Sequence, residues 1–490
     1  MRLSELIADG PMPTKLPSDP EIIGLSADSR AVKPGYLFAA LAGSRQKGSD
    51  FIADAVRHGA VAVLAAPDAA SAAEASHVAL VADPNPRRRL ALMAAQFYGP
   101  QPKTIAAVTG TNGKTSVAAF TRQIWLRLGY RAATIGTLGV IADEFTHDFH
   151  HTTPDPVSLH EALAGLAKAG IDHLALEASS HGLDQCRLDG VVIGAAAFTN
   201  LTRDHFDYHP TVEAYFKAKA RLFEVLLPSG GTAVLNADID EAAALETICR
   251  ARRHRLLRFG AKGQEIKLLE RRDESGGQAL KLEVLGLRRD IFLPLPGAFQ
   301  TSNVLASLGL AIGTGEKPDD ALGTLEALRS VRGRLELVGR HSSGAPVYVD
   351  YAHTPDGIET VLRALRPYAS RHLGIVFGCG GDRDKGKRPL MGQIAAKFAD
   401  RAIVTDDNPR TEEAAAIRAA ILAACPKAIE IGDRRQAIEA AIAALEAGDA
   451  LVIAGKGHEA GQIVGATVIP FDDASVARDA LRASGGEILS

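Results

Sequence analysis

A glycine-rich loop with a lysine and hydroxyls, Gly110-Thr-Asn-Gly-Lys-Thr-Ser116, has the residue types and spacing of a phosphate-binding site. In such a loop the backbone N–H groups and the N-terminus of the following helix face the phosphates. Lys114 would neutralise their charge, and the Thr115 hydroxyl would reach Mg²⁺. Val108 stands where the usual pattern has its first glycine, so the fit is to a shorter variant. The loop predicts an ATP site, and the alternative is a turn that merely contains a lysine.

Two further side chains with chemical potential follow predicted strands. Glu177 lies near the C-terminal end of the mainly apolar run 171–178, and His205 follows the run 191–199. Ligands of open α/β sheets bind beyond the carboxyl ends of the strands, so both side chains should face the same edge as the glycine-rich loop. A carboxylate and a neutral imidazole can bind a metal ion beside a nucleotide. A lone histidine after a strand is more often structural, but two such strand ends in one domain favour function.

Residues 339 to 490 contain four predicted strands, each followed by a polar loop. Arginine binds carboxylates bidentately and glutamate accepts an ammonium group, so a rim of such loops suits a small zwitterion with carboxylates at both ends. Ordinary solvated loops are the alternative. The side chains expected to line the rim are Arg383, Lys387, Arg388, Asn408, Arg410, Lys456 and Glu459.

The elements that must position these residues alternate between strand and helix along most of the chain. The runs 104–108 and 117–128 predict the strand and helix on either side of the glycine-rich loop. The regular alternation predicts an α/β protein. Breaks at Tyr98-Gly-Pro-Gln-Pro102 and Ser342-Ser-Gly344 divide it into three domains. These are a small α/β domain over 1–100, a central P-loop ATPase domain over 101–338 and a C-terminal Rossmann-like domain over 339–490.

The composition excludes several classes of protein. The chain has 490 residues, a net charge of −3 and 46% hydrophobic residues, which is typical of a globular protein without a basic surface for nucleic acid. Its four cysteines form no CxxC pair, which argues against a disulfide framework and fits a reducing cytoplasm. No apolar run approaches the length of a membrane span. We therefore expect a cytoplasmic protein that acts as a monomer on small molecules, with no nucleic-acid or membrane partner.

Five segments taken together resemble the Mur ligases of peptidoglycan synthesis, and the resemblance covers all three domains. The segments, in chain order, are Thr109-Gly-Thr-Asn-Gly-Lys-Thr115, Glu177-Ala-Ser-Ser-His-Gly-Leu183, Asn200-Leu-Thr-Arg-Asp-His205, Asp350-Tyr-Ala-His-Thr-Pro-Asp356 and Asp407-Asn-Pro-Arg410. The pattern is most similar to the family members that add meso-diaminopimelate to UDP-N-acetylmuramoyl-L-alanyl-D-glutamate. The resemblance implies an ADP-forming amide ligase that works through an acyl phosphate, with ATP and Mg²⁺.

The resemblance also assigns roles that the residues alone do not suggest. From the sequence alone, Lys217, Lys219 and Arg221 of a predicted amphipathic helix indicate a solvated face. The resemblance instead implies that Lys219 is carbamylated to N6-carboxylysine and acts as a metal ligand. Lys114, Glu177, His205 and Lys219 would be catalytic. The metal ligands would be Thr115, Glu177, His205 and carbamylated Lys219.

The remaining site residues implied by the resemblance fall into three groups. Those expected to bind ATP are Gly110, Thr111, Asn112, Gly113, Lys114, Thr115, Ser116, Asn303, Arg334 and Asp350. Those expected to bind the UDP-muramoyl dipeptide are Ser29, Gly43, Ser44, Arg45, Gln46, Thr152, Thr153, Ser179, Gln185 and Arg187. Those expected to bind diaminopimelate are Arg383, Asp407, Asn408, Pro409, Arg410, Gly455 and Glu459.

Three other functions remain open at this point. The lysine-adding version of the ligase is disfavoured because Arg410 can bind a distal carboxylate that lysine lacks. A folylpolyglutamate synthetase would not need the UDP-binding domain. A P-loop switch that makes no bond would need neither a second metal site nor the charged rim. The chain also departs from the family at Gln300, where asparagine is usual, and at Cys186, where histidine is usual, and we assign Cys186 no role.

Overall fold

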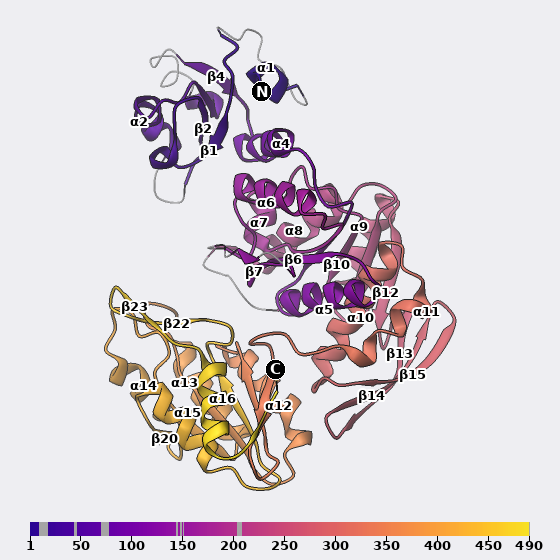
Figure 1. Ribbon diagram of the computed structural model, residues 1–490, viewed down its shortest axis with the longest axis vertical. Helices are drawn as coiled ribbons and strands as arrows, with labels where there is room; N and C mark the ends of the chain where they lie inside the picture. The colour runs from indigo at the N-terminus through magenta and orange to yellow at the C-terminus, as the bar shows by residue number, and fades with distance from the viewer. Residues whose placement is uncertain are drawn as a thin grey trace. The chain divides into compact units, whose positions relative to one another are not determined.

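The computed structural model describes residues 1–8, 18–43, 47–69, 78–143, 146–147, 149, 151–202 and 208–489. Its internal contacts divide the chain into two units (Figure 1). Unit 1 comprises Met1–Lys267 and Leu305–Ala321, and unit 2 comprises Leu268–Val304 and Leu322–Ser490.

The first sheet of unit 1 is parallel, with the strand order β1-β2-β3-β4. Both of its faces are covered by apolar side chains, as a parallel sheet requires. Helix α4, which ends at Tyr98, the first residue of the predicted break, packs against α6 of the same unit (Figure 1). The elements are α1 Leu3–Leu6, β1 Gly24–Ser26, β2 Tyr36–Ala40, α2 Ile52–Arg57, β3 Ala62–Ala65, β4 Ala79–Ala82 and α4 Pro86–Tyr98.

Over the described residues, the second sheet has eleven strands in the order β15-β14-β13-β12-β11-β10-β5-β9-β6-β7-β8, of which β14 and β15 belong to unit 2. Its central strands are parallel, and β7 and β8 extend it as antiparallel strands. Its other strands are β5 Thr104–Thr109, β6 Ala132–Gly136, β7 Gly139–Ile141, β8 Thr146–His147, β9 His173–Glu177, β10 Ala195–Phe198, β11 Thr232–Asn236, β12 Arg255–Gly260 and β13 Ile266–Glu274, the last of which continues into unit 2. The helices are α5 Lys114–Arg127, α6 Pro156–Lys168, α7 Ser180–Asp184, α8 Val212–Arg221 and α9 Ala242–Ala251.

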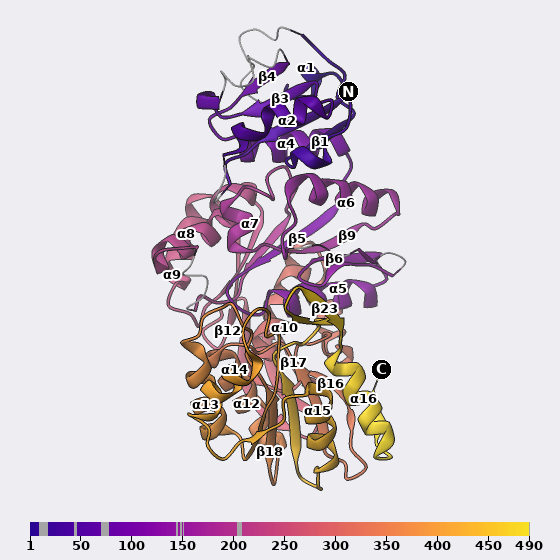
Figure 2. The same cartoon turned by 90° about the vertical axis from the view of Figure 1, so that its left-hand side faces the viewer.

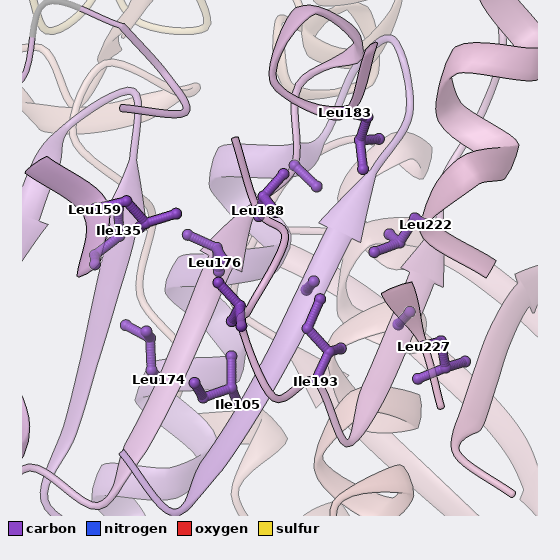
Figure 3. Packing of buried hydrophobic residues seen from close by; sticks show 14 of the residues in the cluster. Ile105, Ile135, Leu159, Leu174, Leu176, Leu183, Leu188, Ile193, Leu222 and Leu227 are labelled. Atoms are coloured by element: carbon purple, nitrogen blue, oxygen red, sulfur yellow. The ribbon is translucent and has the colours of Figure 1, made fainter. Parts of the chain in front are cut away.

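A continuous apolar cluster fixes this sheet against its helices. Figure 3 shows Ile105 of β5 and Leu174 and Leu176 of β9 among leucines from the helical segments. The alanine-rich strands β5 and β10 present small side chains, so neighbouring helices can approach them closely. The predicted strands of this region are confirmed, although β10 starts at Ala195 rather than at residue 191.

Unit 2 contains an antiparallel hairpin and a mainly parallel C-terminal sheet. The hairpin strands are β14 Gly277–Val284 and β15 Leu287–Leu293, which pair in antiparallel register. The sheet has the order β20-β19-β18-β21-β17-β16-β24. Its strands are β16 Glu336–Arg340, β17 Pro346–Asp350, β18 Leu373–Phe377, β19 Arg401–Val404, β20 Ile429–Glu430, β21 Ala450–Ala454 and β24 Glu487–Ile488.

Helices cover both faces of this C-terminal sheet (Figure 2). One face carries α12 Pro355–Leu365, α13 Lys387–Phe398 and α14 Ala414–Leu422, and the other carries α15 Arg434–Ala443 and α16 Asp473–Ala483. A small separate hairpin, β22 Gly461–Val464 with β23 Thr467–Pro470, follows β21. The remaining helices are α10 Ala298–Gly313, which runs from unit 2 into unit 1, and α11 Pro318–Leu322. The predicted limit at 338/339 falls inside β16, which pairs with β17.

Replacing Leu176 with alanine should destabilise unit 1 strongly. The side chain is fully buried in the apolar cluster of Figure 3, and losing it leaves a cavity that costs about 2–5 kcal/mol. Leu390→Ala is the matched control, because that leucine is 49% exposed. Urea unfolding followed by fluorescence should show a large decrease in the free energy of unfolding for Leu176→Ala only. Equal, small effects of the two variants would contradict the packing described here.

Candidate active site

The glycine-rich loop joins β5 to α5, as the sequence predicts. Helix α5 begins at Lys114, directly after Gly113, whose φ of 89° lies in the left-handed region. The Lys114 ammonium donates to the carbonyl oxygens of Gly110 and Thr111, both at 2.8 Å. The backbone N–H groups at the N-terminus of α5 therefore lie beside a lysine side chain, as in an anion-binding site.

Gly110 is required at its position by close approach as well as by conformation. Its φ is 145°, and a Cβ atom there would lie 1.9 Å from the Thr199 hydroxyl oxygen. Thr199 directly follows β10, which pairs in parallel with β5. The hydroxyl of Thr199 donates to the Asn112 carbonyl at 2.7 Å, and the Asn112 N–H donates to Asn200 at 2.9 Å. The end of β10 thus shapes the loop.

Glu177 meets the start of α5, because β9 lies between β5 and β6 in the sheet. The Thr115 hydroxyl donates to the Glu177 carboxylate at 3.1 Å. The carboxylate also accepts from the backbone N–H of Thr137 at 2.9 Å and from its hydroxyl at 3.2 Å. Sequence reasoning missed Thr137, although its place one residue after a strand of the same sheet is a usable signal. A hydroxyl and a carboxylate are hard oxygen donors of the kind that Mg²⁺ prefers.

Lys219 is buried, so the interpretation of this lysine as solvent-exposed is wrong. Its ammonium donates to the Gly110 carbonyl at 2.7 Å and lies 4.4 Å from the centre of the Tyr215 ring. The Tyr215 hydroxyl in turn lies 3.2 Å from that of Thr111. Lys217 is exposed, as expected. Small alanines on both sides of Lys219 and an aromatic residue one turn earlier were the signals for burial.

His205, the other predicted metal ligand, lies outside the described residues, as do Ser44, Arg45 and Gln46. Within the described ranges, no group of three or more His, Cys, Asp or Glu side chains could hold a metal ion. Thr115 and Glu177 are therefore the two predicted ligands that the structure brings together directly.

Four of the predicted muramoyl-side residues form one hydrogen-bonded group. The Arg187 guanidinium donates to the Thr153 carbonyl at 2.7 Å and to the Gln185 side chain at 2.8 Å. The Thr153 hydroxyl donates to the Glu177 carbonyl and accepts from Ser179. The group thus connects directly to the Glu177 strand end. The hydroxyl oxygens of Thr152 and Thr137 lie 3.1 Å apart. Ser29 begins a short 3₁₀ helix after β1, and Gly43 lies in the loop after β2.

Asp189 is a buried carboxylate that pairs with two arginines, and sequence analysis did not predict this role. Its carboxylate accepts from Arg88 of α4 at 3.1 Å and from Arg221 of α8 at 2.8 Å. Arg221 comes two residues after Lys219, so the ion pair connects the helix that carries Lys219 to a helix of the first domain. Cys186 is also buried here, and burial raises the pKa of its thiol.

Of the predicted nucleotide residues of unit 2, Arg334 lies just before β16, Asp350 is the last residue of β17, and Asn303 lies on α10. The buried Asp350 carboxylate accepts from the N–H groups of Leu335 and Ala352 at 2.6 and 2.7 Å. Burial raises the pKa of this carboxyl. The Arg334 guanidinium lies 4.5 Å from the centre of the Tyr351 ring. Asn303 donates to the buried Gln300 side chain at 3.0 Å, so the glutamine that departs from the family orients a predicted ATP residue.

The predicted diaminopimelate residues lie in loops after β18, β19 and β21. The Asn408 amide donates to Glu459 at 2.9 Å, and the Arg410 guanidinium donates to the Gly381 carbonyl at 2.8 Å. Arg410 has a φ of 52°, and its backbone pairs with β22 through Ile463 and Gly465. A Cβ at Gly455 would lie 2.6 Å from the Asp407 carboxylate, so glycine is needed for the close approach of these two loops.

Three cations expected to line the rim have partners within the protein instead. Arg388 is buried and forms a bidentate pair with Glu412 at 2.9 and 3.1 Å. This pair lowers the pKa of Glu412 to about 2. Lys387 donates to the His353 carbonyl at 2.9 Å. Lys456 has no exposed surface. Arg383 is exposed, as expected of a rim residue.

Comparison with known proteins decides the family. Models of the Mur ligase middle domain, the Mur ligase glutamate ligase domain and the Mur ligase family catalytic domain match residues 108–311, 333–457 and 21–98. The chain belongs to the Mur ligase family. It is therefore an ATP-using ligase with the family's three-domain α/β architecture, rather than a nucleotide switch.

Two curated relatives of this Mur ligase carry the same name, UDP-N-acetylmuramoyl-L-alanyl-D-glutamate--2,6-diaminopimelate ligase. The one from Mesorhizobium japonicum is 52% identical over 98% of this chain and 99% of its own length. The one from Caulobacter vibrioides is 53% identical over 95% of this chain and 96% of its own. A solved structure with that ligase name is 34% identical, has a TM-score of 0.73 and covers 99% of each chain.

More distant solved structures share the fold alone. The MurF ligase of Thermotoga maritima in complex with ADP is 19% identical, with a TM-score of 0.61 over 94% of this chain. A folylpolyglutamate synthase of Mycobacterium tuberculosis is 21% identical, with a TM-score of 0.60, and covers 75% of this chain. In the part of the chain that the structure describes, no helix is both long and apolar enough to cross a membrane.

Gly110→Ala should abolish tight nucleotide binding. The new Cβ would collide with the Thr199 hydroxyl and shift the loop away from the phosphates. Gly129→Ala is the matched control, because Gly129 also has a positive φ of 90° but has no atom within 4 Å of its added Cβ. Calorimetric titration with a non-hydrolysable ATP analogue should show about ten- to hundredfold weaker binding for Gly110→Ala, because a displaced loop loses hydrogen bonds to the charged phosphates. Comparable weakening in both variants would point to strain alone.

His458 should stay neutral well below pH 6.5. Burial and the nearby Arg334 and Arg332 lower the pKa of its imidazole from 6.5 to about 4. The unfolded chain takes up this proton near its ordinary pKa, so the His458 contribution to the free energy of unfolding is full above pH 6.5 and declines towards pH 4. A ¹³C-histidine NMR titration, assigned with His458→Gln, should show this low midpoint. A midpoint near 6.5 would contradict the burial described.

Proposed function

We propose that this Mur ligase adds meso-diaminopimelate to UDP-N-acetylmuramoyl-L-alanyl-D-glutamate, with ATP converted to ADP and phosphate, in cytoplasmic peptidoglycan precursor synthesis. The observation that carries the proposal is the full-length similarity, at 52–53% identity, to relatives named for this reaction. The loops that carry Asn408, Arg410 and Glu459 support it, because an amide, an arginine and a carboxylate together suit a zwitterion with two carboxylates.

The reaction begins with activation of a poor electrophile. ATP transfers its terminal phosphoryl group to the D-glutamyl side-chain carboxylate, which gives an acyl phosphate and ADP. The diaminopimelate amine then attacks the acyl carbon, the amide bond forms, and phosphate leaves as the amine loses a proton. Backbone donors of Gly110–Ser116 and the charge of Lys114 would hold the ATP phosphates during the first step. Asn303, Arg334 and Asp350 would bind the rest of the nucleotide.

Mg²⁺ would neutralise phosphate charge in this reaction, with Thr115, Glu177 and His205 as ligands. The 3.1 Å contact between Thr115 and Glu177 supports this assignment. Lys219 would complete the site as N6-carboxylysine. The ammonium would first lose a proton, and the neutral amine would then add to CO₂ and release a second proton. A buried cation would thus become an anion with two oxygen donors. Its place on the Gly110 carbonyl, beside the loop that would hold the phosphates, supports a role at this position.

Substrate recognition would be divided among the three domains. The first domain, with Ser29 and residues 43–46, would bind the UDP moiety, and the Arg187 group of the central domain would bind the muramoyl peptide. The C-terminal loops would bind diaminopimelate. The domain limits we propose are 1–100, 101–338 and 339–490, and we propose a cytoplasmic monomer.

Arg410 would form a bidentate pair with the distal carboxylate, which lysine lacks, so lysine would leave the guanidinium without its partner.

Phosphate release from ATP should be stimulated by meso-diaminopimelate and not by L-lysine when the UDP-dipeptide is present. Mass spectrometry of the product should show the UDP-tripeptide. Arg410→Lys keeps the charge but loses the planar guanidinium that can bind a carboxylate bidentately. The preference of this variant for diaminopimelate over lysine should therefore fall at least about tenfold. Arg435→Lys, at an exposed arginine of α15, is the matched control. Equal use of lysine by the wild-type protein would overturn the specificity, and no stimulation by either amine would overturn the reaction.

A further inference from the structure

A fully buried ammonium group lies behind the C-terminal loops. The Lys456 side chain has no exposed surface, and its Nζ donates to Asn408 Oδ1 at 2.9 Å and to Glu459 Oε2 at 3.0 Å. Removing a charge from water is costly unless it is paired and hydrogen-bonded. The folded protein therefore holds a carboxylate and an amide oxygen close to this one atom.

The ammonium group fixes which way the Asn408 amide points. Asn408 Oδ1 accepts from two donors, Lys456 Nζ and the backbone N–H of Ile463, both at 2.9 Å. An amide NH₂ group in that place would face two donors and no acceptor. Its nitrogen must therefore face the other way, where it donates to Glu459 Oε2 at 2.9 Å. Lys456, Asn408 and Glu459 form a closed triangle in which one orientation of each group is favoured.

The triangle is tied to the backbone on two sides. On one side, Gln462 of β22 donates to the Asp407 carbonyl at 2.7 Å. On the other, the fully buried Arg434 pairs with Asp473 at 2.6 Å and donates to the Ala454 carbonyl at 3.0 Å. Because the backbone is held by these other groups, loss of the Lys456 charge should change side-chain orientation more than loop position.

We propose that Lys456 is a positioning residue for the incoming amino acid: its buried ammonium orients the Asn408 amide and holds Glu459 Oε2, which leaves Glu459 Oε1 to accept the substrate ammonium. The inference rests on the proposed role of Asn408 and Glu459 in binding diaminopimelate. Lys456 itself does not contact the substrate, because its side chain is enclosed by protein. Its effect belongs to amino-acid binding and not to ATP or the UDP-dipeptide.

Lys456→Met tests this role, because methionine has nearly the length of lysine and no charge. The KM for diaminopimelate should rise about ten- to hundredfold, as expected when a charged hydrogen bond is lost from a buried group. The KM values for ATP and the UDP-dipeptide should stay within about twofold of wild type, as should kcat at saturating diaminopimelate.

A second variant distinguishes loss of the ammonium group from an indirect effect on folding. Lys456→Ala leaves a space into which a small ammonium ion can diffuse, so added n-propylammonium should lower the KM for diaminopimelate towards the wild-type value. Tetramethylammonium, which has no N–H donor, should not. A purely structural role for Lys456 would give no such difference between the two ions.

Asp449→Asn is the matched control. Asp449 is a buried charge directly before β21, whereas Lys456 follows the same strand. The Asp449 carboxylate pairs with His372 and Arg401, away from the loops. This variant should lower the melting temperature without changing the KM for diaminopimelate. If Lys456→Met behaves like Asp449→Asn, or raises all three KM values together, the inference is overturned while the proposed function stands. Wild-type protein that diaminopimelate does not stimulate would overturn the proposed function itself.

Discussion

The parallel pairing of β5 with β9 on one side and β10 on the other is the constraint on which the rest of unit 1's site depends. It brings three strand ends to one edge, so that Gly110, Glu177 and Thr199 become neighbours although they are far apart in the sequence. All three strands are almost wholly buried, and their small and apolar side chains let helices pack against both faces of the sheet. Thr199 then leaves room for no side chain at Gly110. Loop shape is thus a consequence of strand register.

Buried charges form the second layer of organisation, and each has a partner at short distance. Asp189 pairs with arginines of α4 and α8, Arg434 with Asp473, and Lys456 with Glu459. A buried pair adds little stability compared with an apolar pair of the same shape, but breaking one leaves an uncompensated charge. Such pairs therefore favour one arrangement of the loops and helices that they join. In this protein those loops and helices carry the proposed substrate and metal residues.

The sequence predicted most strands, the helix after the glycine-rich loop, and the strand-end position of Glu177, because apolar periodicity and glycine placement are local signals. It failed at Lys219, which it placed in solvent, and at Arg388 and Lys456, which it placed on the ligand-binding rim although both are buried. Charge alone predicts exposure, and the partner that makes burial tolerable lies up to about 110 residues away, as with Gly110 for Lys219. Asp189 was missed for the same reason, since neither of its arginine partners is a sequence neighbour.

The sequence by itself determined the family, the α/β class and the identity of the chemical groups, because motifs of this length and order are specific and secondary structure follows from local pattern. The tertiary structure alone decided which oxygen of Glu177 faces Thr115, which way the Asn408 amide points, and which lysines are buried. These features depend on distance and direction between segments that only folding brings together. A one-dimensional pattern specifies the donors and acceptors of a site, and packing specifies their partners.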